Sequence, residues 1–412
     1  MSIADGLASR MKTVRQLKPR QIILVVILWT VALVVVVIGV SARGVMPAVR
    51  VTDFAHFYTL GHLASSHQVS TLYDKAALRD AHLTLVPTSR GYDFPPLYPP
   101  QVAMLFAPLS GLSYEYALIV WNVLTVAAYG LIVWSAWKPV SKQLPNRTLV
   151  FTAAVAFVPF LSLVLTGQST IVILGAFWAG WLALERKRRL LAGMAFGLLA
   201  IKPQFGIPLA VVVLARREWA MLGGALLSVA IQASGVWLML GWEAFEGFAR
   251  ALPIAVSEVD ALESKPHLSH SIRALTQIAP DVIAVPLWVG LAVAVLWYTA
   301  RVWRSEAPMR VRLGAVILAS VLVSPHTMIY DVTVIALSLL WFGAFMQEPA
   351  QREHSVSYWK TVHGLFAALA IQTLDILSLQ VSVLLMAWLL MLVTRAVFER
   401  PAVDDTSRAA AA

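Results

Sequence analysis

The chain has 412 residues, of which 59% are hydrophobic and only 13% are charged, and its net charge is +10. Soluble domains carry about 25% charged residues, so a water-facing surface cannot enclose this chain and lipid is the solvent for most of it. It contains no cysteine, which excludes disulfides, thiolate metal sites and a cysteine nucleophile.

The N-terminal part pairs a basic stretch, residues 1–20, with an apolar run over 21–40. This run is longer than the apolar core of a signal peptide, and no small-residue cleavage site follows it, so it predicts a retained first span with a cytoplasmic basic flank. Other basic residues also gather in short clusters beside apolar runs. That pattern is typical of membrane topology and does not favour nucleic-acid binding, which needs one coherent basic face.

A membrane span needs about 20 apolar residues. Runs of that order follow at 114–137, 148–166, 169–184, 219–240, 283–302, 310–325, 329–347, 360–377 and 379–398, with shorter runs at 98–112, 190–201 and 204–215. If 98–112 is a half-helix entering and leaving from one side, and the other two short runs meet at Lys202-Pro203, every basic loop faces the cytoplasm.

The sequence therefore predicts an all-α integral membrane bundle of about 10–13 transmembrane or half-membrane helices. We expect one polytopic membrane domain over 21–398, with long external loops at 41–97 and 241–282. The polar, alanine-rich tail at 399–412 is predicted to be a disordered cytoplasmic segment.

Asp53 follows the first span by about a dozen residues and has aromatic neighbours. A carboxylate in such a setting can accept a proton from an alcohol, which is the role of a general base. The alternative is a helix N-cap formed by Thr52 or Asp53, and both interpretations can hold together.

Two further polar groups interrupt apolar runs. Gln168 lies at a helix boundary, where it either binds a sugar or phosphate or belongs to a turn with a cap. Lys202 lies between two short apolar helices, and a buried cation is costly unless it is paired. A phosphate, or a carboxylate such as that of Asp53, would pair it.

The segment 324–331 places His326 and Asp331 five residues apart at another helix junction. The imidazole can donate to a phosphate or orient a carboxylate, although a lone histidine is more often structural. The histidines of the loop 41–97 match no compact ligand spacing, so no metal is expected. Nucleotide-binding, hydride-transfer and protease motifs do not occur in the sequence.

Taken in order, several short motifs resemble those of glycosyltransferase family 87, the polyprenyl-phosphate-mannose-dependent mannosyltransferase-like family with the GT-C membrane fold. The resemblance runs from about residue 20 to about residue 345 and rests on Asp53-Phe54, Phe57-Tyr58, Leu72-Tyr73-Asp74, Phe94-Pro95-Pro96, Tyr98-Pro99-Pro100, Gly167-Gln168, Ala192-Gly193, Lys202-Pro203-Gln204, Ser324-Pro325-His326 and Tyr330-Asp331.

The resemblance implies a membrane hexosyltransferase, with mannose favoured, that moves the sugar from a polyprenyl phosphate to a lipid or glycan hydroxyl with inversion. It implies Asp53 as general base with His326 beside it or the donor phosphate. Lys202, Gln204, Gln168 and Tyr58 are the implied donor or phosphate contacts. No cofactor or metal is implied, since Phe54 follows Asp53 where related GT-C enzymes often carry a second acid.

The location implied is the bacterial inner membrane, with the site facing the periplasm or cell exterior, membrane lipids as surroundings and no nucleic acid as partner. Two other functions stay open on the sequence. One is a transporter or flippase of lipid-linked sugars, with Lys202 and His326 lining a path. The other is a noncatalytic scaffold, in which Asp53, Lys202 and His326 would not converge.

Overall fold

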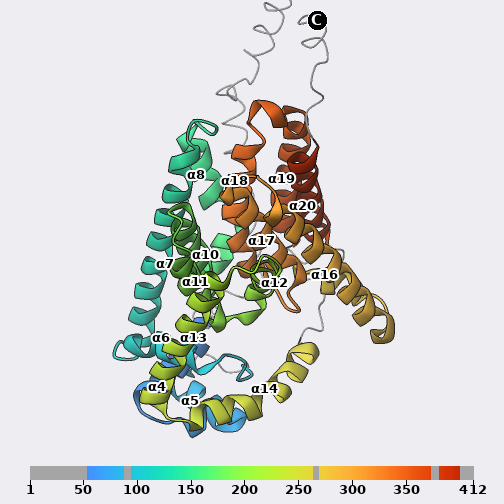
Figure 1. Cartoon of the computed structure of the whole chain (residues 1–412). Coiled ribbons are helices and arrows are strands. Elements are labelled where there is room, and N and C mark those ends of the chain that lie inside the picture. Colours follow the sequence, from blue (N-terminus) through green and yellow to red (C-terminus); the bar gives the residue numbers. More distant parts are fainter. Residues whose placement is uncertain (1–52, 88–93, 263–268, 373–379, 400–412) are drawn as a thin grey trace, which may run out of the picture.

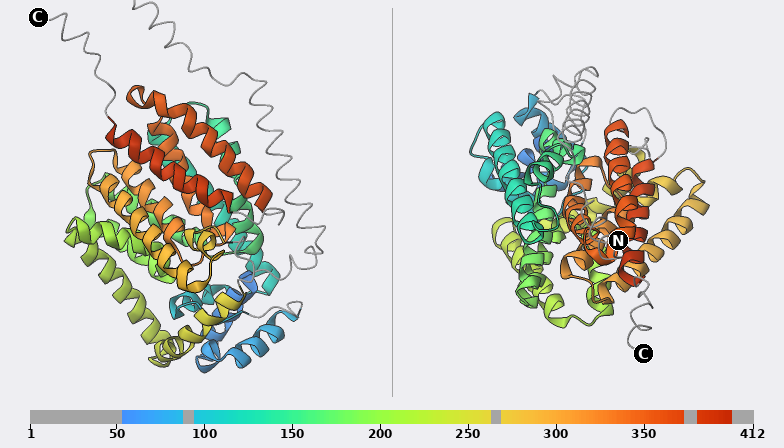
Figure 2. Two further views of the ribbon diagram at one scale, coloured as in Figure 1. Left: turned by 90° about the vertical axis from the view of Figure 1, so that its right-hand side faces the viewer. Right: turned by 90° about the horizontal axis from the view of Figure 1, so that it is seen from above.

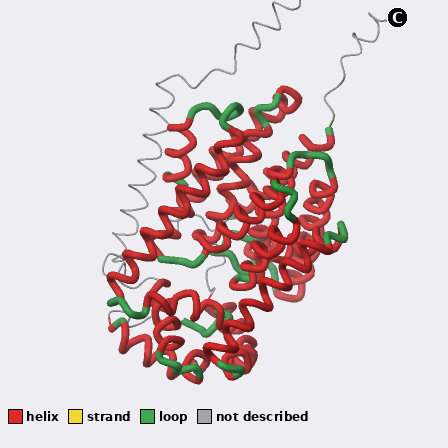
Figure 3. The backbone as a smooth tube through the Cα atoms, turned by 60° about the vertical axis from the view of Figure 1, so that its left-hand side comes forward, coloured by secondary structure: helices red, strands yellow, loops and turns green. Residues whose placement is uncertain are grey.

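The computed structural model describes residues 53–87, 94–262, 269–372 and 380–399, and all regular structure in them is helical (Figure 3). Within this part of the chain the predicted all-α membrane fold is confirmed. The predicted span at 21–40, the basic stretch 1–20 and the tail after Glu399 lie outside the described residues.

Helices occur in all the apolar runs that the sequence offers after residue 97. In chain order they are α6 (Pro100–Phe106) with η3 (Ala107–Leu109), α7 (Tyr114–Trp137), α8 (Arg147–Val155), α9 (Val158–Thr166), α10 (Thr170–Glu185), α11 (Arg189–Gly197) with η5 (Leu198–Ile201), η6 (Pro203–Gly206) with α12 (Ile207–Ala215), α13 (Trp219–Leu240), α16 (Asp281–Arg304), α17 (Met309–Val323), η8 (Ile329–Val334) with α18 (Ile335–Phe345), α19 (Arg352–Gln372) and α20 (Val381–Phe398).

Four helices of the described residues are long and apolar enough to cross a membrane: Tyr114–Val140, Trp219–Leu240, Asp281–Arg304 and Val381–Phe398. Two bent pairs raise the number to six if each is one span, with bends of 48° between α8 and α9 and 101° between the α18 and α19 segments. The shorter apolar helices include those on both sides of Lys202, as predicted. The protein is therefore a multi-pass membrane protein with broken helices.

The core is built around α17, whose residues from Leu313 to Val323 are all buried. It packs against α16 and α18, its neighbours in sequence, and against α10, α12 and α20. Seen from above in Figure 2, α7 and α8 lie on one side of the bundle and α19 and α20 on the other. In contrast, α13 and α16 expose most of their apolar side chains, which suits helices that face lipid.

A helical lobe closes one end of the bundle, at the bottom of Figure 1. We call it the α4/α14 lobe, and its members are α4 (Asp53–Ser65), η1 (Ser70–Tyr73), α5 (Lys75–Leu85) and α14 (Glu243–Leu262). The described parts of the two segments predicted as external loops thus contain helices that pack together, with the Tyr73 and Phe248 rings 5.8 Å apart. Within the predicted loop 41–97, residues 53–65 form α4, and aromatic packing buries most of this helix: Phe57 stacks on Phe106 at 4.8 Å.

Small residues set the position of α11 against α13. A Cβ on Gly193 would lie 2.0 Å from the Met221 carbonyl oxygen, and one on Gly224 would lie 2.1 Å from that of Leu190. Glycines at such contact points let membrane helices approach closely without a side chain between them. Because η5 continues α11 directly, this contact also fixes where the chain breaks at Lys202.

The basic turns between helices are linked to one another. Arg189 forms an ion pair with Glu218, which joins the turn before α11 to the turn before α13. Arg304 donates to the Ala215 carbonyl over 3.4 Å, which adds the end of α16. These links place the turns on one side of the short α11–α12 hairpin, as the positive-inside prediction requires.

Candidate functional site

The site is assembled from five polar residues that four separate segments supply. We call them the Lys202 cluster: Asp53, Gln168, Thr170, Lys202 and Asp331. They come from the start of α4, the α9–α10 turn with the first residue of α10, the break between η5 and η6, and η8. Sequence separations of 115 and 161 residues are closed by hydrogen bonds within this group.

Asp53 is the first residue of α4, where the partial positive charge of a helix N-terminus favours a carboxylate. Its Oδ2 accepts a hydrogen bond of 2.7 Å from Gln168 Nε2. Within the described residues, Gln168 is the hydrogen-bond partner of the Asp53 carboxylate. The other oxygen, Oδ1, is therefore available to accept a proton. Whether Thr52 caps the helix lies outside the described residues.

Gln168 reaches Asp53 because the preceding glycine permits a close turn. Gly167 ends α9 in the left-handed conformation, with φ of 63°. A Cβ there would also lie 2.6 Å from the Phe54 Cβ, so the turn and α4 touch at a point where only glycine fits. Gln168 is 2% exposed, and its Oε1 accepts from Lys202 Nζ at 3.3 Å.

Lys202 is 5% exposed, and all three donor positions of its ammonium group have an acceptor. Nζ lies 2.8 Å from Asp331 Oδ1, 3.0 Å from Thr170 Oγ1 and 3.3 Å from Gln168 Oε1. From the sequence alone, a phosphate or a carboxylate such as that of Asp53 is the expected partner of this cation. A carboxylate does so, but it is Asp331, with Asp53 linked only through Gln168.

Asp331 is a site residue that the sequence marks beside His326 but to which it assigns no role. Its Oδ1 accepts from both Lys202 and Thr170, the latter at 2.5 Å, and the residue is 2% exposed. The available signal was its place in the motif that follows His326, at the start of an apolar run. A partner for a buried lysine had to exist, but the spacing along the chain does not say which carboxylate it is.

The other predicted residues lie around the cluster rather than in it. His326 is half-buried on the loop that leads from α17 to Asp331, held by hydrogen bonds between its backbone and the Ser324 hydroxyl. Gln204 is half-buried on η6, two residues after Lys202. Tyr58 is not brought to the cluster, because its hydroxyl donates to the Leu112 carbonyl over 2.8 Å.

The surroundings of the cluster raise the basicity of the Asp53 carboxylate. Burial raises the pKa of Asp53, while the Gln168 hydrogen bond and the Lys202 charge oppose the rise and the Asp331 charge adds to it. Tyr98 borders the same charges, since its raised pKa results from burial first and then from Asp53 and Asp331. A carboxylate with a raised pKa and one unengaged oxygen is equipped to take a proton from an alcohol.

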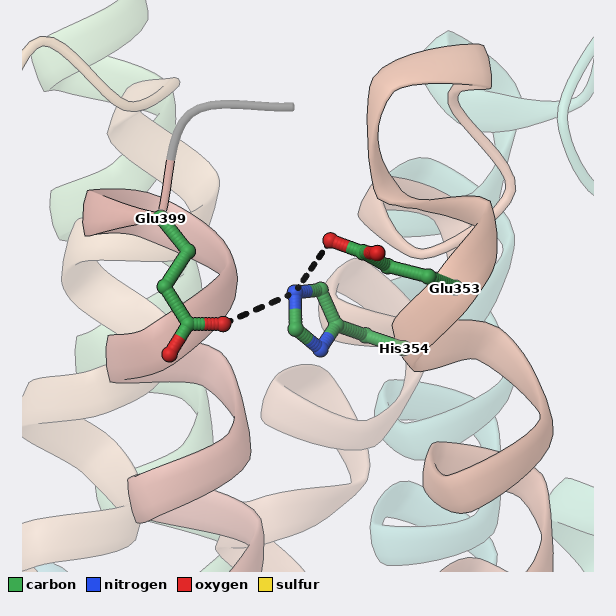
Figure 4. A group of neighbouring side chains, drawn as sticks. All are labelled: Glu353, His354 and Glu399. Atoms are coloured by element: carbon green, nitrogen blue, oxygen red, sulfur yellow. Dashed lines mark ion pairs between the residues drawn. The ribbon is translucent and has the colours of Figure 1, made fainter. Parts of the chain in front are cut away.

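Among the described residues, one group has metal-ligand spacing: Glu353, His354 and Glu399. It joins the start of α19 to the end of α20 (Figure 4). It lies at the end of the molecule opposite the α4/α14 lobe, and the side chains of its two glutamates are 65% and 55% exposed. This surface group contributes nothing to the candidate site.

Comparison with known proteins agrees with this architecture. The family description "Glycosyltransferase family 87" matches residues 97–325, which is more than half of the chain and includes Gln168 and Lys202. Asp53 and Asp331 lie outside the matched range, although both contact it directly. No curated protein and no solved structure matches the chain. On the family match, the chain belongs to glycosyltransferase family 87 and is a membrane glycosyltransferase.

Proposed function

We propose that this enzyme transfers a hexose, with mannose favoured, from a polyprenyl phosphate to a hydroxyl of a lipid or glycan acceptor. The transfer inverts the anomeric carbon and takes place on the outer face of a bacterial inner membrane. The observation that carries the proposal is the Asp53 carboxylate, whose Oδ2 is fixed by Gln168 at 2.7 Å while Oδ1 stays available.

In this proposal Asp53 acts as the general base. Oδ1 takes the proton of the acceptor hydroxyl as its oxygen attacks the anomeric carbon, and the bond from that carbon to the donor phosphate oxygen breaks. The phosphate leaves with the electron pair of that bond, so the phosphodiester monoanion of the donor becomes a phosphomonoester dianion, and no nucleotide takes part. Gln168 is the positioning residue, because it holds the carboxylate between the acceptor and the buried charge of Lys202.

Lys202 has a supporting part in this proposal. Its charge is matched by Asp331 at 2.8 Å, so we assign it to ordering Gln168 and Thr170 rather than to direct phosphate binding. His326 and Gln204 remain predicted contacts of the donor. The loop carrying His326 begins where buried α17 ends, which makes it a suitable wall for a substrate pocket.

The test compares wild type with Asp53→Asn in an assay with radiolabelled polyprenyl-phosphate mannose and membrane-derived acceptor. General bases contribute roughly 10²- to 10⁴-fold to rate, so we expect a loss of that order in Asp53→Asn with unchanged expression and thermal unfolding. Asp80→Asn, an exposed carboxylate of α5 in the same lobe, is the matched control and should keep wild-type activity. Full transfer by Asp53→Asn would remove the proposed base.

The rival function, movement of a lipid-linked sugar across the membrane, makes no new bond. Mass spectrometry of lipids and glycans from cells with and without the gene separates the two. A glycosyltransferase leaves an acceptor short by one hexose mass in the deletion strain, whereas a transporter leaves its unaltered substrate on the wrong side of the membrane.

A further inference from the structure

The proposed transfer needs a cation for the donor phosphate, and the Lys202 cluster does not supply one. Its two carboxylates and one ammonium leave a net negative charge, and each donor of Lys202 already has an acceptor. A phosphate placed on this cluster would meet Asp331 and Asp53 at close range. The leaving group is therefore bound by other residues, if the proposed function is correct.

A second buried polar group lies at Ser269–Arg273, in a segment from which the sequence analysis assigned no residue. Ser269 and Ser271 are 3% and 0% exposed, and neither hydroxyl has a hydrogen-bond partner among the described residues. Buried hydroxyls without partners are costly and uncommon in native proteins. Two of them, separated by one residue, make this segment a candidate for binding a polar ligand.

Contacts join this group to the loop that leads to the Lys202 cluster. The His270 amide donates to the Thr327 carbonyl at 2.7 Å, and Arg273 Nη1 donates to the Pro325 carbonyl at 3.4 Å. The loop held in this way carries His326 and continues into η8 with Asp331. A ligand at Ser269 and Ser271 is thus connected to the predicted base through one short loop.

The charge of the group comes from Arg273. Burial lowers the pKa of His270 to about 4, so its imidazole is neutral and offers a phosphate no charge. The ring is instead fixed by α20, with Nδ1 2.9 Å from Ser382 Oγ. Arg273 is half-buried, and its guanidinium has the donor geometry that suits phosphate oxygens.

The surroundings favour a lipid phosphate over a soluble one. The Arg273 guanidinium lies 5.9 Å from the Trp288 ring on α16, the helix that projects from the bundle on the right of Figure 1. On α16 an apolar stripe is exposed, including Val282 at 80% and Val293 at 59%. In a bilayer such a stripe borders acyl or prenyl chains. A head group bound at the N-terminal end of α16 would therefore have its chain along this stripe.

We propose that Ser269, Ser271 and Arg273 bind the phosphate of the polyprenyl donor, with its prenyl chain lying along the exposed face of α16. The two serine hydroxyls donate to phosphate oxygens and Arg273 supplies the matching charge. The inference rests on the proposed function for the identity of the lipid, but its residues are distinct from the Lys202 cluster.

The test measures binding of farnesyl phosphate to the purified full-length protein by ligand-induced thermal stabilisation, with farnesol and inorganic phosphate as separate arms. Wild type should bind farnesyl phosphate, and both other probes should bind at least tenfold more weakly. Arg273→Gln should weaken farnesyl phosphate at least tenfold, and Arg273→Lys should restore part of the loss. Equal binding of inorganic phosphate would overturn the lipid assignment.

Arg301→Gln is the matched control, because Arg301 also stacks on a tryptophan of α16, with its guanidinium 4.8 Å from the Trp297 ring. It should bind farnesyl phosphate within about twofold of wild type, since it has no part in the proposed site. Wild-type affinity in Arg273→Gln would overturn the proposal. Ser269→Ala with Ser271→Ala should also bind several-fold more weakly, and wild-type affinity in this pair would count against it even if Arg273→Gln fails to fold.

One more variant separates this inference from the proposed function. Asp53→Asn should lose transfer but bind farnesyl phosphate as wild type does. If Asp53→Asn still transfers sugar, the base assignment fails while the binding result at Arg273 stands. If transfer depends on Asp53 but not on Arg273, Ser269 or Ser271, the phosphate site fails and the base remains.

Discussion

Lys202 illustrates how a charge is tolerated among apolar helices. Its ammonium group has a carboxylate, a hydroxyl and an amide oxygen within 3.3 Å, each from a different residue. The side chains of the lysine and of Asp331 are 5% and 3% exposed, so water contributes little to their solvation. Each partner therefore depends on the other, and loss of either leaves an uncompensated buried charge.

Removing one partner of the Lys202–Asp331 pair should destabilise the protein more than replacing both partners by apolar side chains. We expect Lys202→Met or Asp331→Asn alone to cost about 3–5 kcal/mol, whereas Lys202→Met with Asp331→Leu recovers most of that stability. Thermal unfolding in detergent measures the effect. The double variant should stay poorly active, because Gln168 loses the lysine that orders it. Additive destabilisation in the double variant would contradict the coupling.

The pH dependence of transfer reports the same coupling. Asp53 must be deprotonated to act as base, and burial raises its pKa, so activity should fall on acidification at a higher pH than for an exposed carboxylate. Asp331→Asn removes a charge that raises this pKa and should move the acidic limb of kcat/KM to lower pH. Lys202→Met should move it to higher pH. A shift of both variants in one direction would refute the assignment.

Single residues were predictable where a polar side chain interrupts an apolar run. Gln168 and Lys202 stand out for that reason, and Asp53 stands out because aromatics follow it. Their partners were not predictable: the choice of Asp331 over Asp53 as the lysine's carboxylate depends on how η8 meets the helix break. Ser269 and Ser271 could not be singled out from the sequence, because serine is common in polar loops and only the structure shows that these two are buried.

At the level of helices, apolar runs gave boundaries within a few residues of those observed, as for α7 and α20. The helices of the α4/α14 lobe were missed because they are too short or too polar to span a membrane. α4 is buried by aromatic rings of α6 and α7, including Phe106 and Trp121, which the local sequence does not reveal. Local hydrophobicity therefore finds long apolar helices, including the buried α17, but not short or polar helices whose burial depends on distant aromatic rings.

The contact between α11 and α13 offers a sharp test on neighbouring residues. Gly224→Ala places a Cβ 2.1 Å from the Leu190 carbonyl oxygen, whereas at Gly223 nothing lies within 4 Å. We expect Gly224→Ala to lower stability by about 1–3 kcal/mol, as overpacking does. Gly223→Ala should be neutral or slightly stabilising, because alanine favours a helix. Thermal unfolding of the two variants decides, and equal stability would contradict the close approach.

At the scale of the whole molecule, the α11–α12 hairpin sets the depth of the site. Each arm combines an α-helix with a 3-10 turn and rises about 20 Å, less than the roughly 30 Å of a bilayer core. With the basic turns at Arg189 and Glu218 at a membrane surface, as predicted, we expect Lys202 at the hairpin tip to lie within the membrane thickness. In that orientation a substrate would reach Lys202 from the side of the α4/α14 lobe or from the lipid.

The absence of cysteine makes this orientation simple to test. Gln68→Cys places a thiol on the exposed surface of the lobe, and Arg186→Cys places one on an exposed basic turn. A membrane-impermeant maleimide should label Gln68→Cys in intact cells and Arg186→Cys only after permeabilisation, because the predicted topology places the basic turns in the cytoplasm. Labelling of both variants from the same side would contradict the predicted topology.

The full burial of α17 has a consequence for biogenesis. With 15 residues, α17 rises about 22 Å, less than the roughly 30 Å of a bilayer core, so it does not cross a membrane alone. Of the helices that pack against it, α10, α12 and α16 precede it in the chain, whereas α18 and α20 follow it. We therefore expect α17 to enter the membrane against helices made before it, and α18 and α20 to pack over it afterwards.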